Sequence, residues 1–347
     1  MKTSGFAYRL PDHLIAQSPV EPRDSARLIR ASDLTDWTVR DLPELLHPGD
    51  LVVVNDTRVR AARLIGRREP TGGRVELLLL GRRGDRWQAL ARPARRLRAG
   101  SMVRTGGLVA RVETDPVEGQ VDLTLRTATG EAGEEVVERA IAEAGLVPLP
   151  PYIHRTLDDP ERYQTVFADR VGSAAAPTAG LHLTSRILGG LAERGIGLAR
   201  IELRIGLDTF RPITTEEIAD HRMHSEWMDV PEATVDRMME TRRTGGRVVA
   251  VGTTVVRALE TAWRDGRPAP YRGSTSLYIT PGHRFGAVDV LLTNFHMPGS
   301  SLLVLVAAFV GGSWRSVYET ARDRGYRFLS FGDAMLLERA PTPAGSR

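Results

Sequence analysis

Two patterns of hydrophobic and polar positions divide the chain. In most of it, continuous apolar runs such as Leu51–Val54 and Val248–Val251 alternate with segments that have the spacing of a helix, which predicts buried strands and helices in alternation. Between residues 60 and 148 the apolar positions alternate with polar ones in short segments separated by glycines, which predicts a small antiparallel barrel. We expect an α/β protein with a large mixed domain, residues 1–59 and 149–347, and an inserted β-barrel domain, residues 60–148.

The same patterns place the individual elements. The barrel strands are expected at Val75–Leu80, Trp87–Ala91, Met102–Arg104, Leu108–Val112 and Val121–Arg126. The large domain should add strands at Leu198–Ile205, Ser274–Ile279 and Val288–Leu292. Helices are expected at Glu134–Ala144, Ser185–Glu193 with Thr184 as its cap, Thr214–Asp220 with a capping-box pattern, Glu232–Thr241, Thr254–Trp263, Leu302–Phe309 and Ser313–Arg322.

The composition excludes several kinds of catalytic and metal-binding site. The chain has no cysteine, and Lys2 is its only lysine, so thiolate metal sites, a cysteine nucleophile and a Schiff-base lysine in the core are excluded. The longest apolar run, Leu302–Val310, is shorter than a bilayer requires and is typical of a buried helix. We expect a cytoplasmic protein without a membrane segment, and a monomer.

Charge is informative in one region only. The net charge of +4 is small for a chain of 347 residues. From Arg60 to Arg126, however, 15 arginines stand against seven acidic residues, an excess of eight. Such a module is suited to a polyanion, and a solvated arginine-rich surface is the alternative.

The loop of residues 163–184 is built from small and polar residues where a core would be bulky. Gly180 lets backbone approach a ligand closely, and Pro177 fixes a turn. Because the loop runs past His182 into the start of a helix, it suits an anionic ligand. A tight connecting loop without a ligand is the alternative interpretation.

Polar residues also follow several predicted buried strands. They occur at Asn55-Asp56-Thr57-Arg58, at Gly252-Thr253-Thr254, at Thr293-Asn294-Phe295-His296 and at Gly332-Asp333. In a mostly parallel sheet these ends form one rim, which would bring together His182, His224, Asn294, His296 and Asp333. The spacing His221-x-x-His224-x-Glu226 offers acid/base or ribose-binding groups, and we expect no metal because no third ligand stands at a recognisable spacing.

These stretches together resemble one family, the S-adenosylmethionine:tRNA ribosyltransferase-isomerases of queuosine biosynthesis. The matching stretches cover nearly the whole chain: Leu14–Gln17, Asn55–Val59, Pro148–Ile153, Arg162–Phe167, Ala175–His182, Thr209–Pro212, Met223–Glu226, Thr293–His296 and Gly332–Met335. The resemblance implies that S-adenosylmethionine donates its ribosyl part to 7-aminomethyl-7-deazaguanine, the modified wobble base of certain tRNAs. Adenine and methionine leave, and the sugar becomes an epoxycyclopentanediol.

That chemistry needs groups of recognisable types. A base must remove the C5′ proton beside the sulfonium, adenine needs a proton donor, and the methionine carboxylate and the ribose hydroxyls must be held. We expect the catalytic residues His182, at the reacting sugar, together with His224, Glu226, His296 and Asp333. Substrate-binding residues are expected at Asn55, Asp56, Arg58, Tyr163, Gln164, Ser173, Pro177, Thr178, Gly180, Phe210, Arg211, Thr253, Thr254, Arg257 and Asn294.

The chain departs from the family pattern at five positions, Arg204, Asp208, Val255, Thr280 and Gly299. These departures keep open a paralogue that uses the same donor chemistry on a small-molecule acceptor, such as a free 7-deazapurine. A non-catalytic tRNA-binding protein on the same scaffold is a third hypothesis. Adenine release from S-adenosylmethionine, with and without precursor tRNA, distinguishes the three.

Overall fold

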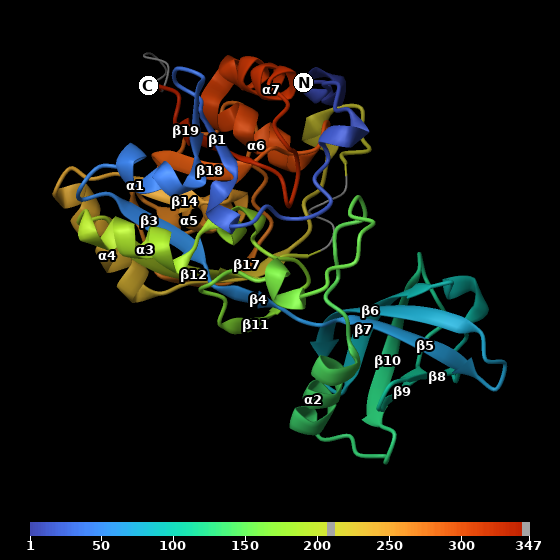
Figure 1. Cartoon of the computed structure of the whole chain (residues 1–347). Coiled ribbons are helices and arrows are strands. Elements are labelled where there is room, and N and C mark those ends of the chain that lie inside the picture. The colour runs from blue at the N-terminus through green and yellow to red at the C-terminus, as the bar shows by residue number, and fades with distance from the viewer. Residues whose placement is uncertain (207–211, 342–347) are drawn as a thin grey trace. The chain divides into compact units, whose positions relative to one another are not determined.

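The computed structural model describes residues 1–206 and 212–341 of the chain. The chain divides into two compact units, one made of Met1–Arg58 and Pro150–Arg347 and the other of Val59–Leu149 (Figure 1). The fold class is the expected one, a mixed α/β unit and a closed antiparallel barrel.

The large unit is built on one nine-stranded sheet. Its four central strands are parallel, in the order β12 (Gly197–Leu203), β3 (Leu51–Asn55), β14 (Val248–Val251) and β18 (Val290–Asn294). Antiparallel β13 (Glu226–Val230) and β17 (Tyr271–Thr275) extend one side. The other side continues with β19 (Ala334–Glu338), which runs antiparallel to β18, and then β1 (Arg27–Arg30) and β2 (Thr35–Thr38).

Helices cover both faces of this sheet and enclose a separate apolar core on each. The larger core holds side chains of α4 (Glu232–Arg243), α5 (Thr253–Thr261), α6 (Ser301–Val310) and α7 (Trp314–Asp323). The second core holds those of α1 (Leu42–Leu45) and α3 (Ser185–Glu193). As expected, the Thr184 hydroxyl caps α3 by accepting the N–H of Ile187 at 3.4 Å. The strands are apolar on both faces because each face is covered.

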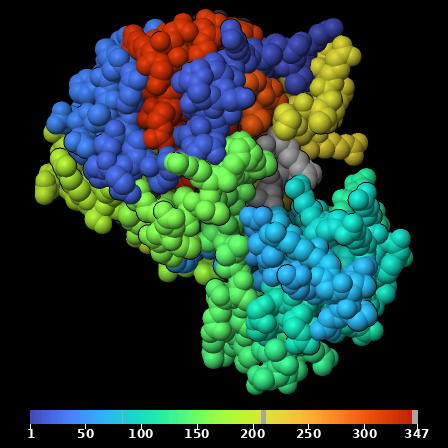
Figure 2. Space-filling model, turned by 45° about the vertical axis from the view of Figure 1, so that its right-hand side comes forward, coloured from blue at the N-terminus to red at the C-terminus, as the bar shows by residue number. Residues whose placement is uncertain are grey.

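The two ends of the large unit's chain pack together. The ring of Phe6 stacks on that of Trp314, and residues close to the N-terminus lie beside C-terminal segments on the surface in Figure 2. The helical stretch Ser301–Asp323 is long and apolar enough, by length and composition alone, to cross a membrane, but 56% of its most apolar window is buried inside the protein. A core helix passes the same test, and α6 is a core helix of this unit.

The small unit is a closed six-stranded barrel in the order β10-β7-β6-β5-β8-β9. The strands are β5 (Arg63–Glu69), β6 (Arg74–Arg83), β7 (Arg86–Arg92), β8 (Met102–Thr105), β9 (Leu108–Val112) and β10 (Gln120–Thr127). Helix α2 (Glu134–Ala144) adds Val137 and Ile141 to the barrel core. Short two-stranded pairs complete the list: β4 (Thr57–Val59) with β11 (Arg170–Ser173), and β15 (Trp263–Arg264) with β16 (Arg267–Pro268).

One expected helix is wrong. Of the segment 214–220, only Ile218–Asp220 forms a single 3-10 turn. The Thr215 hydroxyl donates to the carbonyl of Glu217, and the Glu217 carboxylate lies 2.6 Å from the amino group of Met1. The Glu217 carboxylate expected in the capping box therefore has another partner.

Candidate active site

The carboxyl ends of the four parallel strands lie at one edge of the sheet, as the strand-end motifs predicted. Asn55 ends β3, Gly252 follows β14, and Asn294 ends β18. Because β19 runs antiparallel to β18, its first residue pairs with Asn294, so Asp333 also reaches this edge. The four parallel strands and the reversed β19 thus place residues from distant parts of the sequence side by side.

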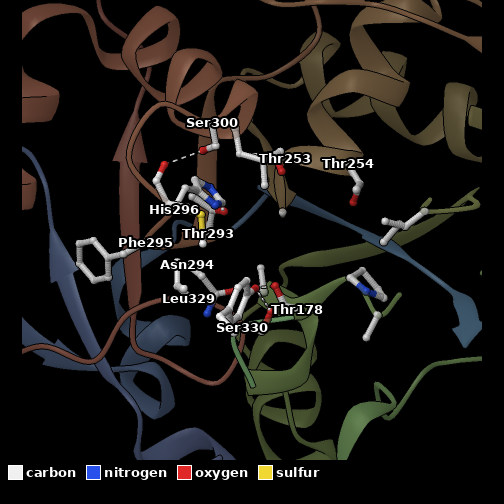
Figure 3. A pocket seen from close by; sticks show the side chains of 18 residues that line it. Thr178, Thr253, Thr254, Thr293, Asn294, Phe295, His296, Ser300, Leu329 and Ser330 are labelled. Atoms are coloured by element: carbon white, nitrogen blue, oxygen red, sulfur yellow. Dashed lines mark hydrogen bonds between the residues drawn. The ribbon is translucent and has the colours of Figure 1, made fainter. Parts of the chain in front are cut away.

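A pocket opens at this edge, between the strand ends and the segment of residues 176–179 (Figure 3). It contains about 630 Å³ of empty space, its open mouth included. Its lining is mixed: apolar walls from Ile205, Met297 and Leu302 surround several hydroxyl groups. The pocket-lining residues are Tyr152, Ala176, Pro177, Thr178, Ala179, Ile205, Gly252, Thr253, Thr254, Thr293, Asn294, Phe295, His296, Met297, Ser300, Leu302, Leu329 and Ser330.

Asn294 connects three segments of this wall. Its Nδ2 lies 3.0 Å from Nε2 of His182 and donates to the carbonyl of Asp333 at 3.3 Å. Its Oδ1 accepts the Thr178 hydroxyl at 3.0 Å. The buried amide therefore uses both its donor and its acceptor to fix the pocket wall, and Thr178 is held in place on the lining.

His182 stands behind the pocket rather than in it. It belongs to a short 3-10 helix, Thr178–His182, is 5% exposed, and is absent from the pocket lining. The backbone carbonyl of Arg23 accepts a hydrogen bond from its ring, so the ring's other nitrogen, Nε2, accepts the Asn294 amide. Burial lowers the pKa of His182 to about 4, and the ring is neutral at physiological pH.

His296 faces the pocket (Figure 3). Its backbone is held by Tyr318, whose hydroxyl accepts its N–H at 3.1 Å, and by Tyr8, whose hydroxyl donates to its carbonyl at 2.5 Å. Its Nε2 lies 3.2 Å from the Thr293 hydroxyl. Burial lowers the pKa of His296 to about 3, so this ring is neutral as well.

The start of α5 forms another wall. The helix begins at Thr253, after Gly252 with φ +93°, a conformation that favours glycine. Glycine has no side chain to cap the helix, and its carbonyl accepts the N–H groups of Val255 and Val256. The N–H groups of Thr253 and Thr254 are therefore the ones left for a ligand. The Thr254 hydroxyl is buried on the pocket lining with no partner among residues 1–206 and 212–341.

Asp333 is a buried carboxylate with a bracing role. It accepts the backbone N–H groups of Arg27 at 3.0 Å and Arg327 at 2.8 Å. Burial raises its pKa, opposed by these hydrogen bonds. The same turn holds Leu329 at φ +69° on the pocket lining, where its N–H donates to the carbonyl of Phe295 at 3.1 Å. Asp333 itself does not line the pocket.

The residues of the predicted group His221, His224 and Glu226 differ in exposure. Glu226 is buried on β13, where it pairs with Arg257 and accepts the N–H of Gly206 at 3.0 Å. His224 is exposed. Among the described parts of the chain, no three His, Asp or Glu side chains are arranged to hold a metal ion. None of Glu226, Arg257 and His224 lines the pocket.

The residues expected after β3 brace the scaffold as well. The Asn55 amide bridges β3 and β12, accepting the N–H of Leu203 at 3.0 Å and donating to its carbonyl at 2.9 Å. Asp56 is buried, its pKa is raised by burial, and its nearest cation is Arg170 at 3.8 Å. Arg58 forms an ion pair with Glu161.

Of the remaining expected residues, some pack in the scaffold and others line the pocket. Tyr163 and Gln164 are buried, and Ser173 joins the carbonyl of Ala175 and the N–H of Ile205 through its hydroxyl. Gly180 is required by packing, since a Cβ there would lie 2.9 Å from the Phe167 ring. Phe210 and Arg211 lie outside the described residues. The expected residues that line the pocket are His296, Pro177, Thr178, Thr253, Thr254 and Asn294.

Sequence reasoning missed several lining residues. Tyr152 and Ser330 meet there, with their hydroxyl oxygens 2.7 Å apart, and Thr293, Met297 and Ser300 complete the β18–α6 loop. Tyr152 follows a proline-rich connector and Ser330 precedes the Gly-Asp motif. The only signal in the sequence for a role of either residue was therefore its position next to such a motif.

The described departures from the family pattern lie off the pocket lining. Arg204 places its Nε 2.8 Å from a Glu202 oxygen and its guanidinium over the Trp227 ring at 4.2 Å. Val255 is fully buried in the core, and Gly299 has φ +65° in a turn. Thr280 also lies elsewhere, and Asp208 is outside the described residues.

Comparison with known proteins covers the chain almost from end to end. The family model described as queuosine biosynthesis protein matches residues 3–337. An S-adenosylmethionine:tRNA ribosyltransferase-isomerase of Anaeromyxobacter sp. (strain Fw109-5) is 48% identical over 98% of this chain and 100% of its own length. The protein of the same name from Symbiobacterium thermophilum is 49% identical over 97% of this chain and 100% of its own length.

A solved structure is similar too. The crystal structure of an S-adenosylmethionine tRNA ribosyltransferase from Thermotoga maritima is 35% identical in sequence. It superimposes with a TM-score of 0.54 over 95% of this chain and 99% of that one.

Proposed function

This chain belongs to the queuosine biosynthesis protein family, and from that membership we propose that it catalyses the reaction for which its relatives are named. It is a ribosyltransferase-isomerase that uses S-adenosylmethionine as donor and tRNA as acceptor. The ribosyl group is transferred to the aminomethyl group of 7-aminomethyl-7-deazaguanine at the wobble position and isomerised to an epoxycyclopentanediol, with release of adenine and methionine. The enzyme is proposed to act as a cytoplasmic monomer.

The observation that carries the assignment of the donor site is the start of α5. Two free backbone N–H groups, the positive end of the helix dipole and the unpartnered hydroxyl of Thr254 converge on the pocket. Three donors at the positive end of a helix favour an anionic group. The methionine carboxylate of S-adenosylmethionine is that group, and the apolar wall of Ile205, Met297 and Leu302 suits the rest of the molecule.

His296 is the proposed proton-transferring group. It faces the pocket, and burial keeps its ring neutral, which is the form with a lone pair for a proton. The C5′ proton beside the sulfonium is acidified by the adjacent positive charge, so a weak base in hydrogen-bond range is appropriate. In this proposal Nε2 donates to the Thr293 hydroxyl, 3.2 Å away, which orients the ring and leaves the Nδ1 lone pair for the substrate proton.

His182, Asn294 and Asp333 act as positioning residues in this proposal. The Nε2 lone pair of His182 is already used by Asn294, so it is not available to a sugar proton. The chain from His182 through Asn294 to Thr178 instead fixes a hydroxyl on the pocket wall. This assigns to His182 a different role from the one expected from the sequence.

The alternatives are not favoured. The relatives named as tRNA enzymes match over their full length, which favours tRNA as the acceptor. A non-catalytic protein would not need a pocket with an unpaired buried hydroxyl, because such a group costs stability.

The test is adenine release from S-adenosylmethionine. We expect release only with tRNA that carries 7-aminomethyl-7-deazaguanine. Release with the free base alone would support a small-molecule acceptor instead. Absence of adenine in every mixture, with donor binding intact, would overturn the enzymatic assignment.

A further inference from the structure

We propose that a row of four arginines on the outer face of the barrel, Arg74, Arg67, Arg104 and Arg126, binds the phosphate backbone of the RNA acceptor. The inference rests on the proposed function, which requires an RNA partner, and it assigns to that partner a surface of the small unit. Each of the four side chains is exposed. We call this set the arginine row.

The strand register sets the residues of the row side by side. Arg67 on β5 pairs directly with Arg74 on β6 at one side and with Arg104 on β8 at the other. Arg104 pairs with Val109 on β9, and Val109 pairs with Arg126 on β10. One continuous cross-strand line over five strands thus reads Arg, Arg, Arg, Val, Arg; these strands are labelled in Figure 1.

Alternation along each strand confirms that the row points outward. The flanking residues Val75, Val103, Ala110 and Leu125 are buried in the barrel core. Directly paired residues share a face of a sheet, so the whole row lies on the solvent side. Arg111 is also exposed. It pairs with Met102 and Thr124, in a cross-strand line next to the arginine row, and adds a fifth guanidinium to the same face.

The barrel's own acids leave most of this charge unpaired. Glu69 lies 2.8 Å from Arg104, but Arg74, Arg111 and Arg126 form no ion pair with any residue the structure describes. Like charges directly opposite one another in a sheet are destabilising. The Arg74–Arg67–Arg104 line is therefore unfavourable for the barrel alone, which points to an anionic partner as its reason.

The spacing and chemistry of the row fit a sugar–phosphate backbone. Neighbouring strands stand about 4.8 Å apart, so the row offers a fork-shaped donor every strand or two along one line. Guanidinium groups bind phosphate oxygens in pairs and are always charged. The row contains no aromatic side chain, so we expect it to hold backbone without reading bases.

The binding test compares two charge-matched variants with the wild type. Arg67→Gln/Arg74→Gln removes two charges from the row, and Arg86→Gln/Arg92→Gln removes two exposed arginines of β7, outside it. We expect the row variant to bind precursor tRNA about tenfold more weakly, with the slope of log K against log salt reduced by roughly 1 to 2. The β7 variant should stay within about twofold of the wild type. Equal losses in both variants, or no loss in the row variant, would overturn the inference.

Kinetics separate this inference from the proposed function. With adenine release as the readout, the row variant should show a raised KM for tRNA and an unchanged kcat at saturating tRNA. Its thermal midpoint should be equal to or above the wild-type value, because the row's repulsion is relieved. If the wild type released no adenine, the proposed function would fail, whereas direct tRNA binding would still decide the role of the row.

Discussion

Replacing Thr254 with valine should weaken donor binding and stabilise the free protein at the same time. Valine has nearly the shape of threonine, so Thr254→Val removes only the hydroxyl. That hydroxyl is buried on the pocket lining and has no partner among the described residues. If this hydroxyl binds the methionine carboxylate, removing it must weaken the complex with the donor. The same change must stabilise the free enzyme, because an unpartnered buried hydroxyl is removed.

The magnitudes follow from the contacts. A hydrogen bond to a charged group contributes about 1.5–3 kcal/mol, which corresponds to a roughly 10- to 150-fold weaker Kd for S-adenosylmethionine. A buried hydroxyl without a partner costs about 1–3 kcal/mol, so the free variant should be more stable by about 1 kcal/mol.

The assay is isothermal titration calorimetry with two ligands and a control variant. Decarboxylated S-adenosylmethionine lacks the carboxylate, so Thr254→Val should hardly affect its binding. The control is Thr261→Val on the same helix, whose hydroxyl donates to the carbonyl of Arg257 and lies 2.7 Å from that of Thr275. This variant should lose stability and keep its affinity for the donor.

Two results would refute the reasoning. Wild-type affinity for S-adenosylmethionine in Thr254→Val would remove the hydroxyl from the site. An equal loss for both ligands would show that the hydroxyl contacts some part of the donor other than its carboxylate.

Three further substitutions probe the proposed roles. His296→Gln should reduce the rate of adenine release in single turnovers by about 100-fold or more, with donor affinity changed only a few-fold; a rate near wild type would exclude His296 from proton transfer. His182 has a folded-state pKa of about 4, below the ordinary value of about 6.5, so its contribution to stability is present above pH 6.5 and is lost as the pH falls toward 4, by about 3 kcal/mol. Urea unfolding of His182→Gln should show a flatter pH dependence over that interval, and an unchanged profile would contradict the buried neutral ring. Glu226→Gln leaves Arg257 buried without its charge partner and should lower the free energy of unfolding by about 3–5 kcal/mol in the same assay. The double variant Glu226→Leu/Arg257→Met should recover most of that stability. A Glu226→Gln variant as stable as the wild type would show that the ion pair is not needed.

The sequence predicted the fold where apolar periodicity was strong. Helices Glu134–Ala144 and Ser185–Glu193 have the expected bounds, because each has a clear apolar face and a clear end. Strand β5 was missed, since Gly66 and the charged run Arg67–Glu69 hide its alternation. Gly66 belongs there because a Cβ would meet the carbonyl of Arg104 at 2.5 Å, a contact that only the closed barrel creates.

The site was predicted less completely, for a reason visible in Asn294, His182 and Asp333. All three were expected at the rim and all three are there, joined by hydrogen bonds. Residue type and strand position predict which side chains converge, but not which of them faces the pocket and which stands one layer behind. His296 and His182 have similar burial and similar pKa values, and only their orientation separates a proposed reactant from a brace.

Arg204 shows how a departure from a family pattern is weighed by structure. In the sequence, an arginine in place of histidine within a polar loop suggested a changed acceptor. In the structure its guanidinium lies between a nearly inaccessible carboxylate, Glu202, and the face of Trp227. Arg170 contacts the other oxygen of the same carboxylate, so Glu202 has two cations and is not left as an unpaired buried charge. A substitution that satisfies a buried charge is explained by the scaffold alone, and specificity for the acceptor must therefore be sought among the residues that face the ligand or the RNA.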